Sequence, residues 1–549
     1  MNKFFIIIFA LFLFFQGCGN DHFLVDSNYR SKVEQRFELK KQLAGSRSEA
    51  LFGVFNSGIS TQEAEALKFL YAYMPLSDLA DYDGSFYLKL VQSSFKARET
   101  FSWGRQVPED IFRHFVLPYR VNNENLDSAR WVFYGELKER LKGMSMKQAA
   151  LEVNHWCHEK VIYQPTDGRT SAPLSTVKTS YGRCGEESTF LVTALRAAAI
   201  PARQVYTPRW AHCDDNHAWV EVWIDGKWNY MGACEPEADL NIAWFTAPAK
   251  RAMLVHTKVF GDYAGSEEVV RKTEDFTEIN VTSNYADVKK IFVRVVDQSG
   301  KPAVKASVDF GLYNYAEFYP IASKLTDTHG TTFLTTGFGD LLVSASQNGM
   351  SGFKKISVGQ TDTLEVKLES HRDTTYTVDM DFYPPVEKTI PPADEQMQKA
   401  NSVRLHQEDS IRTIYRATFI DSAKSALLAE QSGLDKKQLV QLMKAGMGNW
   451  MELKAFVERN RTSAHIFPLL NAVSAKDLRD TRAEILEDHL RNTLNSCKPG
   501  DYENPELFYS SVLNPRVRNE NLTAYRKLLH DKFSSFASAD RDLSAGKIV

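Results

Sequence analysis

Hydrophobic and polar positions recur with different periods along this chain, and each period predicts a different kind of segment. From residue 27 to 145 apolar residues return every three or four positions, for example over 63–73 and 86–97, which predicts a helical module. From 146 to 263 a helical pattern gives way to loops rich in Gly, Ser and Pro and then to strands. That order predicts an α+β unit.

The pattern changes again in the second half of the chain. Residues 289–369 contain short alternating runs separated by turn signals such as residues 297–302 (Asp-Gln-Ser-Gly-Lys-Pro), which predict a small β-sandwich. This segment resembles carboxypeptidase-regulatory-like or transthyretin-like domains. Residues 370–393 hold two Pro-Pro pairs and predict a stiff linker, and residues 394–549 are again helical in pattern. The expected fold class is therefore multidomain α+β.

The two helical segments contain an internal repeat. Residues 116–126, followed by Arg130, recur as residues 512–522, followed by Arg526, with Val-Leu, Arg-Val and Asn-Glu-Asn-Leu in register. The upstream matches are residues 76–79 and 475–478. We interpret the C-terminal helical module as a diverged copy of the N-terminal one.

The N-terminus carries an export signal. Lys3 precedes an apolar run over residues 4–15, which is too short to span a bilayer and suits a signal peptide. Residues 15–18 (Phe-Gln-Gly-Cys) resemble a bacterial lipobox, and this implies a signal peptide over residues 1–18 with a lipid on Cys18. The expected location is the bacterial cell envelope, on the periplasmic or outer surface, with the lipid bilayer as a partner. A plain secretory signal with an incidental cysteine is the alternative.

Charge and cysteine content exclude several classes of partner and of structural site. The 549 residues are too many for one core, and 66 basic against 69 acidic residues give a net charge of only -3. No nucleic-acid partner is expected from so balanced a chain. Beyond Cys18, five cysteines remain without a CxxC pair, so neither a disulfide framework nor a zinc ribbon is predicted. The His and Asp residues of 212–217 lack a recognised ligand spacing, so no metal and no cofactor are expected.

Cys184 is the first candidate for chemistry. It follows Gly182-Arg183 and precedes an apolar run over residues 190–198, which places it at a helix N-terminus. Helix N–H groups and the helix dipole there favour a thiolate and can donate to an oxyanion. Glu186 and Glu187 oppose this effect, so a histidine partner is needed. A buried structural cysteine is the alternative interpretation.

His217 is the candidate partner, at the start of a predicted strand. Alternation places His217 and Trp219 on one face, together with Glu221 and Trp223, and apolar residues on the other. Asp225-Gly226 predicts a two-residue hairpin turn. Continued in strict register, that hairpin places Gly232 opposite Trp219 and Cys234 opposite His217.

Three motifs together are similar to the transglutaminase-like superfamily, and they are residues 183–185, 217–222 and 225–228. Residues 182–186 and 233–235 look most like its peptide:N-glycanase branch. The resemblance covers roughly residues 146–263 and implies a papain-like α+β core with a Cys, His and Asp triad. It implies Cys184 as nucleophile and His217 as its base.

The third member of the triad departs from this pattern, because Gly232 stands where the aspartate is expected. Glu235 is the expected substitute, provided that the strand ends or bulges near Gly232. Orientation of the imidazole by an Asn or by the backbone is the alternative. Trp219 and Trp210 are expected to line the substrate cleft.

The leading function is therefore a thiol-dependent amide-bond hydrolase that forms a thioester, acting as a peptidase or a glycopeptide amidase. Its partner is a protein, peptide or glycopeptide substrate. A protein cross-linking transglutaminase would use the same residues. A catalytically degenerate binding lipoprotein, with the helical modules and the sandwich as a scaffold, is the non-enzyme alternative.

Overall fold

The structure is a computed structural model that describes residues 22–370, 375, 377–390, 394–517 and 522–527. The signal peptide and Cys18 lie outside the described residues, as do residues 518–521 of the second repeat. The chain forms two compact units, 1–92 and 93–549. Their boundary falls inside helix α5 (Gly84–Thr100), within the segment expected to be one helical module.

The first unit is helical, and an aromatic cluster forms its core. Phe37, Phe52 and Tyr71 pack with ring centroids 4.9 to 6.1 Å apart. Ser60 and Glu63 form a capping box that begins the third helix. The helices of this unit are α1 (Ser27–Leu43), α2 (Ser48–Phe52), α3 (Thr61–Ala72), α4 (Asp78–Asp81) and the start of α5.

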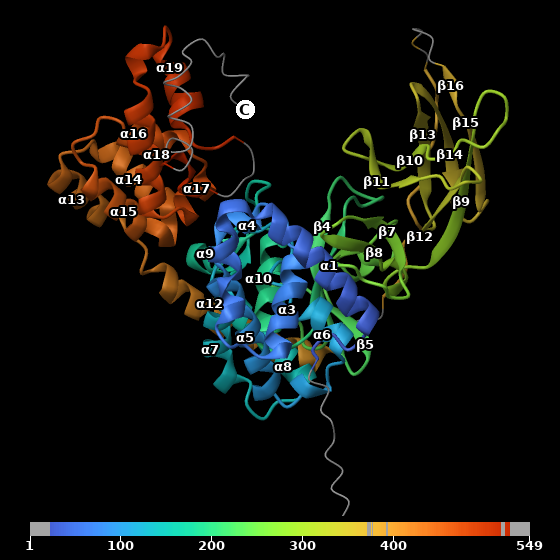
Figure 1. Ribbon diagram of the computed structural model, residues 1–549, viewed down its shortest axis with the longest axis horizontal. Helices are drawn as coiled ribbons and strands as arrows, with labels where there is room; N and C mark the ends of the chain where they lie inside the picture. The colour runs from blue at the N-terminus through green and yellow to red at the C-terminus, as the bar shows by residue number, and fades with distance from the viewer. Residues whose placement is uncertain (1–21, 371–374, 376, 391–393, 518–521, 528–549) are drawn as a thin grey trace, which may run out of the picture. The chain divides into compact units, whose positions relative to one another are not determined.

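The second unit contains a helix buried against a six-stranded sheet (Figure 1). Helix α10 (Cys184–Ala197) is buried along almost its whole length, and its Phe190 ring packs on Phe133 and Trp156. The neighbouring helices are α6 (Glu109–Phe115), α7 (Ala129–Arg140), α8 (Met146–His158), α9 (Pro173–Thr179) and α11 (Thr246–Ala249). Two short parallel strands, β1 (Ile162–Tyr163) and β2 (Tyr181–Gly182), lead into α10.

The sheet has the order β5-β4-β3-β6-β8-β7. Its strands are β3 (Ala202–Thr207), β4 (His217–Ile224), β5 (Lys227–Met231), β6 (His256–Phe260), β7 (Glu268–Lys272) and β8 (Phe276–Asn280). The last two strands extend the sheet beyond residue 263, where the sequence pattern placed its end. Both have only five residues, and charged residues make up most of β7, so neither carries a long apolar run in the sequence.

The predicted hairpin is confirmed up to Met231 and ends there. Asp225 and Gly226 both have positive φ, as the predicted turn requires, and Val220 pairs with Met231. The expected pairing of Cys234 with His217 is wrong, because β5 stops and Gly232 forms an isolated bridge with Glu235 instead.

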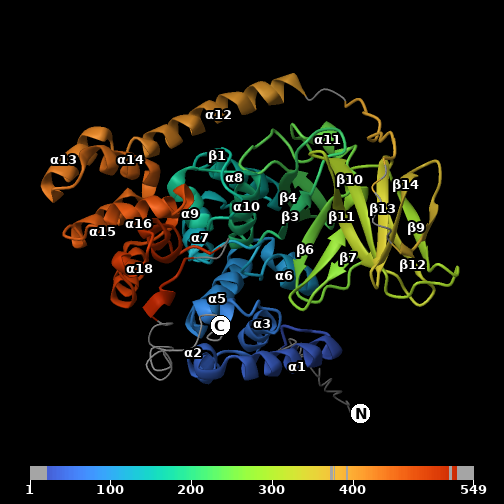
Figure 2. The same cartoon turned by 90° about the horizontal axis from the view of Figure 1, so that it is seen from above.

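Eight further strands form a β-sandwich of two sheets (Figure 2). The five-stranded sheet has the order β11-β10-β13-β14-β16 and the three-stranded sheet the order β12-β9-β15. The strands are β9 (Val288–Val296), β10 (Ser307–Asn314), β11 (Glu317–Leu325), β12 (Thr331–Gly337), β13 (Asp340–Gln347), β14 (Met350–Ser357), β15 (Thr363–Lys367) and β16 (Glu369–Ser370). Strand β11 lies at an edge of its sheet.

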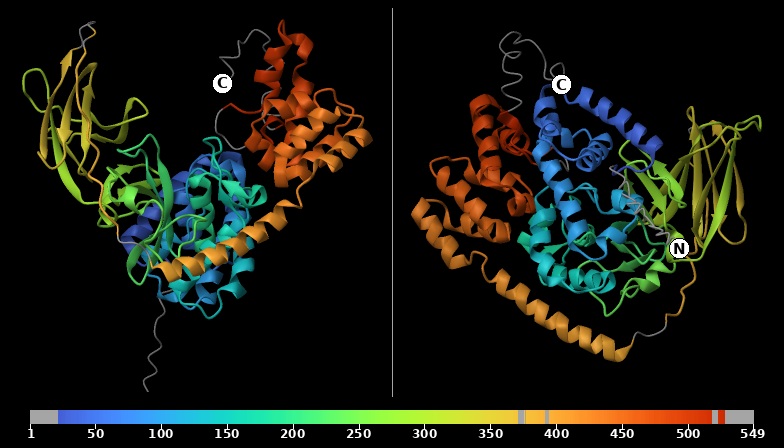
Figure 3. Two further views of the ribbon diagram at one scale, coloured as in Figure 1. Left: turned by 180° about the vertical axis from the view of Figure 1, so that it is seen from behind. Right: turned by 60° about the horizontal axis from the view of Figure 1, so that its bottom comes forward.

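The remaining described residues are helical and begin with one long helix, α12 (Glu395–Arg416), shown in gold in Figure 3. It packs along α8, where Glu408 lies 2.9 Å from His155 and Arg412 donates to the carbonyl of His158. The following helices are α13 (Ser422–Ser432), α14 (Lys436–Gly446), α15 (Trp450–Arg459), α16 (Ile466–Ala472), α17 (Ala475–Asp480), α18 (Ala483–Ser496) and α19 (Pro505–Leu507). The expected multidomain α+β fold class is confirmed.

The two copies of the repeat make the same contacts. Arg130 donates to the carbonyls of Val116 and Pro118. Arg526, the matching residue, donates to the carbonyls of Val512 and Asn514. An arginine that satisfies the same two carbonyls in both segments supports the interpretation of a duplicated helical module.

Among the described residues, no helix combines the length and the apolar character needed to cross a membrane.

Candidate active site

Cys184 is the first residue of α10, and its position follows from a capping box. The preceding residue, Arg183, has extended backbone, and the Glu186 side chain accepts from the Arg183 N–H at 3.1 Å. The Cys184 sulfur lies close enough to the backbone N–H groups of Ala218 and Gly185 for both to lower its pKa. The thiol therefore sits between the helix N-terminus and the start of β4, where the sequence placed it.

His217 begins β4 inside an aromatic box. Its ring lies 4.8 Å from the Trp244 ring, 4.9 Å from Phe245 and 5.6 Å from Trp219. Its Nε2 atom is buried and has no hydrogen-bond partner among the described residues. Burial lowers the pKa of His217 to about 4.

Both members of the pair are therefore neutral at pH 7 in this structure. Burial raises the pKa of the Cys184 thiol, and this effect outweighs the Ala218 N–H and the charge of Arg183, which both lower it. The expectation that the helix N-terminus and a histidine would favour a thiolate is corrected, because desolvation disfavours charge on both groups.

Glu235 does not reach His217. One of its oxygens accepts from the Trp244 indole N–H at 2.8 Å, and no hydrogen bond joins it to the imidazole in the described part of the chain. The strand does end near Gly232, as the interpretation of Glu235 required. Glu235 therefore contacts Trp244, whose ring packs on His217, and does not orient the imidazole directly.

Glu187 lines the pocket beside Cys184, and the sequence interpretation did not predict it as a site residue. It follows Cys184 by three positions, so both lie on one face of α10. Its Oε1 atom is buried without a partner among the described residues. Burial, with added repulsion from Cys234 and Glu235, raises the pKa of Glu187 well above its ordinary value. The three-residue spacing was the signal that could have identified it.

The expected cleft residues Trp219 and Trp210 belong instead to the core. Their rings stack with centroids 6.3 Å apart, and both side chains are buried. Trp219 also donates to the Tyr285 hydroxyl at 2.9 Å. The alternation argument failed because this face of β4 is covered by residues such as Phe245, so both faces of the strand are buried.

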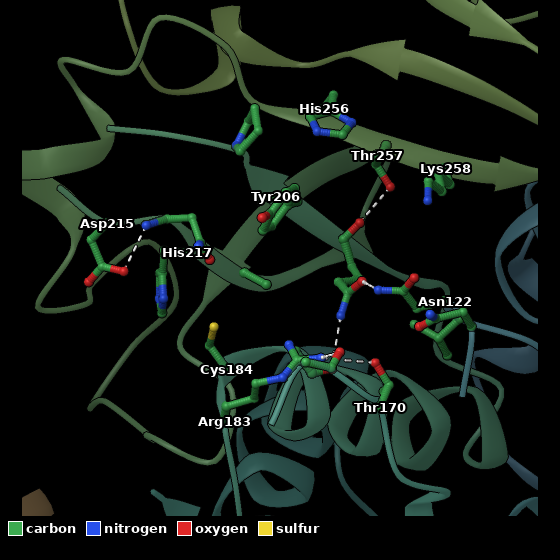
Figure 4. Close-up of a pocket in the computed structure, with 18 of the residues that line it drawn as sticks. Asn122, Thr170, Arg183, Cys184, Tyr206, Asp215, His217, His256, Thr257 and Lys258 are labelled. Atoms are coloured by element: carbon green, nitrogen blue, oxygen red, sulfur yellow. Dashed lines mark hydrogen bonds between the residues drawn. The ribbon is translucent and has the colours of Figure 1, made fainter. Parts of the chain in front are cut away.

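A pocket of about 1060 Å³ opens beside the Cys–His pair (Figure 4). Near Cys184 it is lined by Tyr163, Glu187, Asp215, Glu235 and Trp244. It continues over the half of the sheet that carries Tyr206, His256 and Lys258, and β11 of the sandwich contributes residues 319–323. The pocket is thus built jointly by the α+β core and the sandwich.

A loop over residues 165–171 forms another part of the wall, and buried charges hold it. Arg183 donates to the carbonyls of Asp167 and Gly168. Glu186 accepts from the Thr166 hydroxyl at 2.8 Å and lies 2.8 Å from the ammonium of Lys476 in α17. Lys476 also lies 3.0 Å from the Asp167 carboxylate and donates to the carbonyl of Arg169. The C-terminal helices therefore contact the cap of the Cys184 helix.

The polar segment at 212–215 supports the sandwich. Asn314, at the tip of β10, donates to the carbonyls of Trp210 and Cys213 at 2.9 and 2.7 Å. The Tyr315 N–H donates to the Asp214 carboxylate at 2.7 Å. Within the described residues, no group of three or more His, Cys, Asp and Glu side chains is arranged to hold a metal. This segment docks the hairpin that continues into the pocket wall.

Residues 136–233 match the transglutaminase-like superfamily. The chain contains a transglutaminase-like domain. Proteins of this superfamily generally have a cysteine-protease-like fold. The match begins within α7, includes Cys184, His217 and Gly232, and ends just after β5. A comparison with curated proteins found no match.

The transglutaminase-like domain combines the parts that acyl transfer needs. It places a thiol at a helix N-terminus, where the first N–H groups lack helical partners and are suited to a developing oxyanion. The neutral imidazole of His217, at the start of β4, is an acceptor for the thiol proton. Sheet strands β6 to β8 and the sandwich lie outside the matched residues, so the part of the pocket that they line is not covered by the match.

Proposed function

We propose that the protein is a thiol-dependent amide-bond hydrolase with Cys184 as nucleophile and His217 as base. The observation that carries this proposal is the position of Cys184: its sulfur lies near the backbone N–H of Ala218, the residue that follows His217, and both Cys184 and His217 line the pocket. Nucleophile, base and helix N–H groups then meet at one wall of the pocket.

In the proposed reaction, the sulfur attacks an amide carbonyl while His217 accepts the thiol proton, and a carbon–sulfur bond forms. The carbon–nitrogen bond breaks as the imidazole returns that proton to the departing amine. Water then attacks the thioester and releases an acid and the free thiol. If an amine replaces water in the last step, the product is a cross-link instead.

The substrate class is tested by the products. Purified protein is incubated with a mixture of peptides and N-glycosylated peptides, with and without a primary amine, and the products are identified by mass spectrometry. New peptide ends indicate a peptidase, conversion of glycosylated Asn to Asp indicates a glycopeptide amidase, and incorporated amine indicates a transglutaminase. Products that also form with Cys184→Ala would contradict all three reactions at Cys184, and no product from the wild type would favour a binding scaffold.

We also propose that the protein acts in the bacterial cell envelope, anchored through a lipid on Cys18. The support is the sequence of residues 1–18 alone. Radiolabelled palmitate should enter the wild-type protein and not Cys18→Ser. Equal release of both proteins into the soluble fraction would favour a plain secretory signal.

A further inference from the structure

The end of the pocket away from Cys184 carries a row of charged side chains. Lys258 on β6 pairs in register with Glu278 on β8, and Glu278 pairs with Arg271 on β7. Directly paired residues of neighbouring strands point to the same face. All three residues line the pocket, so its floor here is a three-strand row with two cations around one carboxylate.

The single carboxylate of this row already has a partner. An oxygen of Glu278 lies 2.6 Å from the His256 ring. Burial raises the pKa of Glu278. The contact with His256 and the charges of Lys258 and Arg271 lower this pKa by more than burial raises it, so the net shift is downward. Glu278 is therefore a negative charge held among cations.

Lys258 and Arg271 make no ion pair with any described carboxylate. Both instead stand near the Phe276 ring, at 5.3 and 5.9 Å from its centroid. With one carboxylate in the row, the two permanent cations leave this end of the pocket with an excess of positive charge.

The other carboxyl groups of the pocket lie at its opposite end. Glu187 and Glu235 line it near Cys184, and Figure 4 shows Asp215 beside His217, across the pocket from Lys258. Three carboxyl groups and one cation, Arg183, thus line the end at the nucleophile, whereas two cations and one carboxylate line the far end, so the excess of cations lies at the far end.

Strand geometry gives the length of this arrangement. Ala218, which contacts the Cys184 sulfur, pairs with Tyr206, and Tyr206 pairs with His256, two residues before Lys258. Two strand spacings and two residue steps amount to about 12 Å between Ala218 and Lys258. An extended peptide covers that distance in about three to four residues.

We propose that the Lys258–Arg271 end of the pocket binds a carboxylate of the substrate, about three to four residues from the amide bond that Cys184 attacks. This inference rests on the proposed function, and it assigns the substrate class as an acidic peptide. The carboxylate is either an Asp or Glu side chain or a free peptide C-terminus. Edge strand β11, through residues 319–323, forms the wall beside it.

Binding is measured with the Cys184→Ala protein, so the result does not depend on thiol chemistry. The probes are rhodamine-labelled Ala/Ser peptides that differ only in one Glu, Gln or Lys, or in a free or amidated C-terminus, and the readout is fluorescence anisotropy. We expect Glu or a free carboxylate to tighten binding about threefold to tenfold over the neutral peptides. The Glu and C-terminus arms identify the source of the carboxylate.

The preference should disappear in Lys258→Met/Arg271→Met and reverse toward the Lys peptide in Lys258→Glu/Arg271→Glu. Lys290→Met is the matched control, because Lys290 is also a strand lysine over a ring, Phe333, and does not line the pocket. Equal affinity for the Glu, Gln and Lys peptides together with equal affinity for the free and amidated C-termini, or no measurable binding of any peptide, would overturn the inference. Loss of Cys184 reactivity with the preference intact would instead contradict only the proposed function.

Discussion

At the scale of single residues, desolvation decides the state of the Cys–His pair. Burial raises the pKa of the Cys184 thiol and lowers that of His217 to about 4. A preformed thiolate–imidazolium pair is therefore disfavoured in the resting protein. The proton has to move to His217 during attack, as in general-base catalysis by a neutral imidazole.

The pH profile tests this order of events. Acylation of Cys184 requires neutral His217, so its rate should be nearly constant from about pH 5.5 to 8 and fall below about pH 4. Alkylation by iodoacetamide requires the thiolate and should instead keep rising with pH above 8. A preformed ion pair would give fast alkylation that is already constant at neutral pH, and that result would contradict the neutral resting state.

Glu187 should leave a signature in stability. Because its folded-state pKa is raised, the folded protein keeps a proton that the unfolded chain loses above its ordinary value of 4.5. The free energy of unfolding then falls as the pH rises from 4.5 toward the raised folded-state pKa. Glu187→Gln removes that fall, so the variant should gain stability relative to wild type between about pH 5 and 8 in urea titrations.

Glu186 provides a control, because its pKa is shifted in the opposite direction to that of Glu187. Burial raises its pKa, but Lys476 and the capping N–H groups outweigh burial and the net shift is downward. Its stabilisation is present above pH 4.5 and is lost as pH falls through the lowered folded-state value. Parallel pH curves for Glu187→Gln and wild type would show that Glu187 is not held protonated.

At the scale of elements, the N-terminus of α10 depends on Glu186. This side chain completes the capping box of the helix that carries Cys184, accepts from Ser171 and Thr166, and pairs with buried Lys476. Replacing it should disturb the helix start and the pocket loop together.

Glu186→Gln should lower the free energy of unfolding by about 2 to 4 kcal/mol, because it removes one partner of a buried ion pair and weakens a cap. Glu63→Gln is the matched control, since Glu63 completes an exposed capping box with Ser60, and its cost should stay below about 1 kcal/mol. Equal losses in denaturant titrations of the two variants would show that the contact with Lys476 does not stabilise the fold.

Several elements could be predicted from the sequence, because residues within a few positions of each other determine them. The helix at Cys184 has an apolar run and a cap within a few residues, and the Asp225-Gly226 turn fixes its own hairpin register. The burial of Trp219 depends on the residues that pack over β4, and the position of Glu235 depends on where β5 ends. Local periodicity contains neither piece of information.

At the scale of the whole second unit, residues far apart in sequence build the site. Lys476 reaches the loop of Thr166 across 310 positions, and Arg169 pairs with Asp480 at 2.7 Å. Neither contact was predictable, because a lone lysine or arginine in a helical or loop pattern is usually solvated. The part of the pocket on β7, β8 and β11 was missed because these strands lie outside the predicted α+β unit and come together only in the fold.

These contacts predict that the C-terminal helices support the chemistry. Lys476→Met breaks the same buried ion pair with Glu186 and should lower the free energy of unfolding. In the protein that remains folded it should also lower the acylation rate of Cys184 about tenfold or more, because small displacements of a nucleophile are costly. Lys454→Met is the control, since Lys454 is half-exposed and, within the described residues, its ion pair is with Glu458 on its own helix. Equal rates for both variants and wild type would show that α17 does not position the site.

The central claim is that Cys184 is an acyl-accepting nucleophile assisted by His217, and p-nitrophenyl acetate tests it most directly. The release of p-nitrophenolate is followed in time while mass spectrometry locates the acetyl group. We expect acetyl-Cys184 to form and turn over in the wild type, to form at least about 10²-fold more slowly in His217→Ala, and to be absent in Cys184→Ala. Acetylation that favours exposed Cys213 over Cys184, with rates unchanged in His217→Ala, would contradict the account.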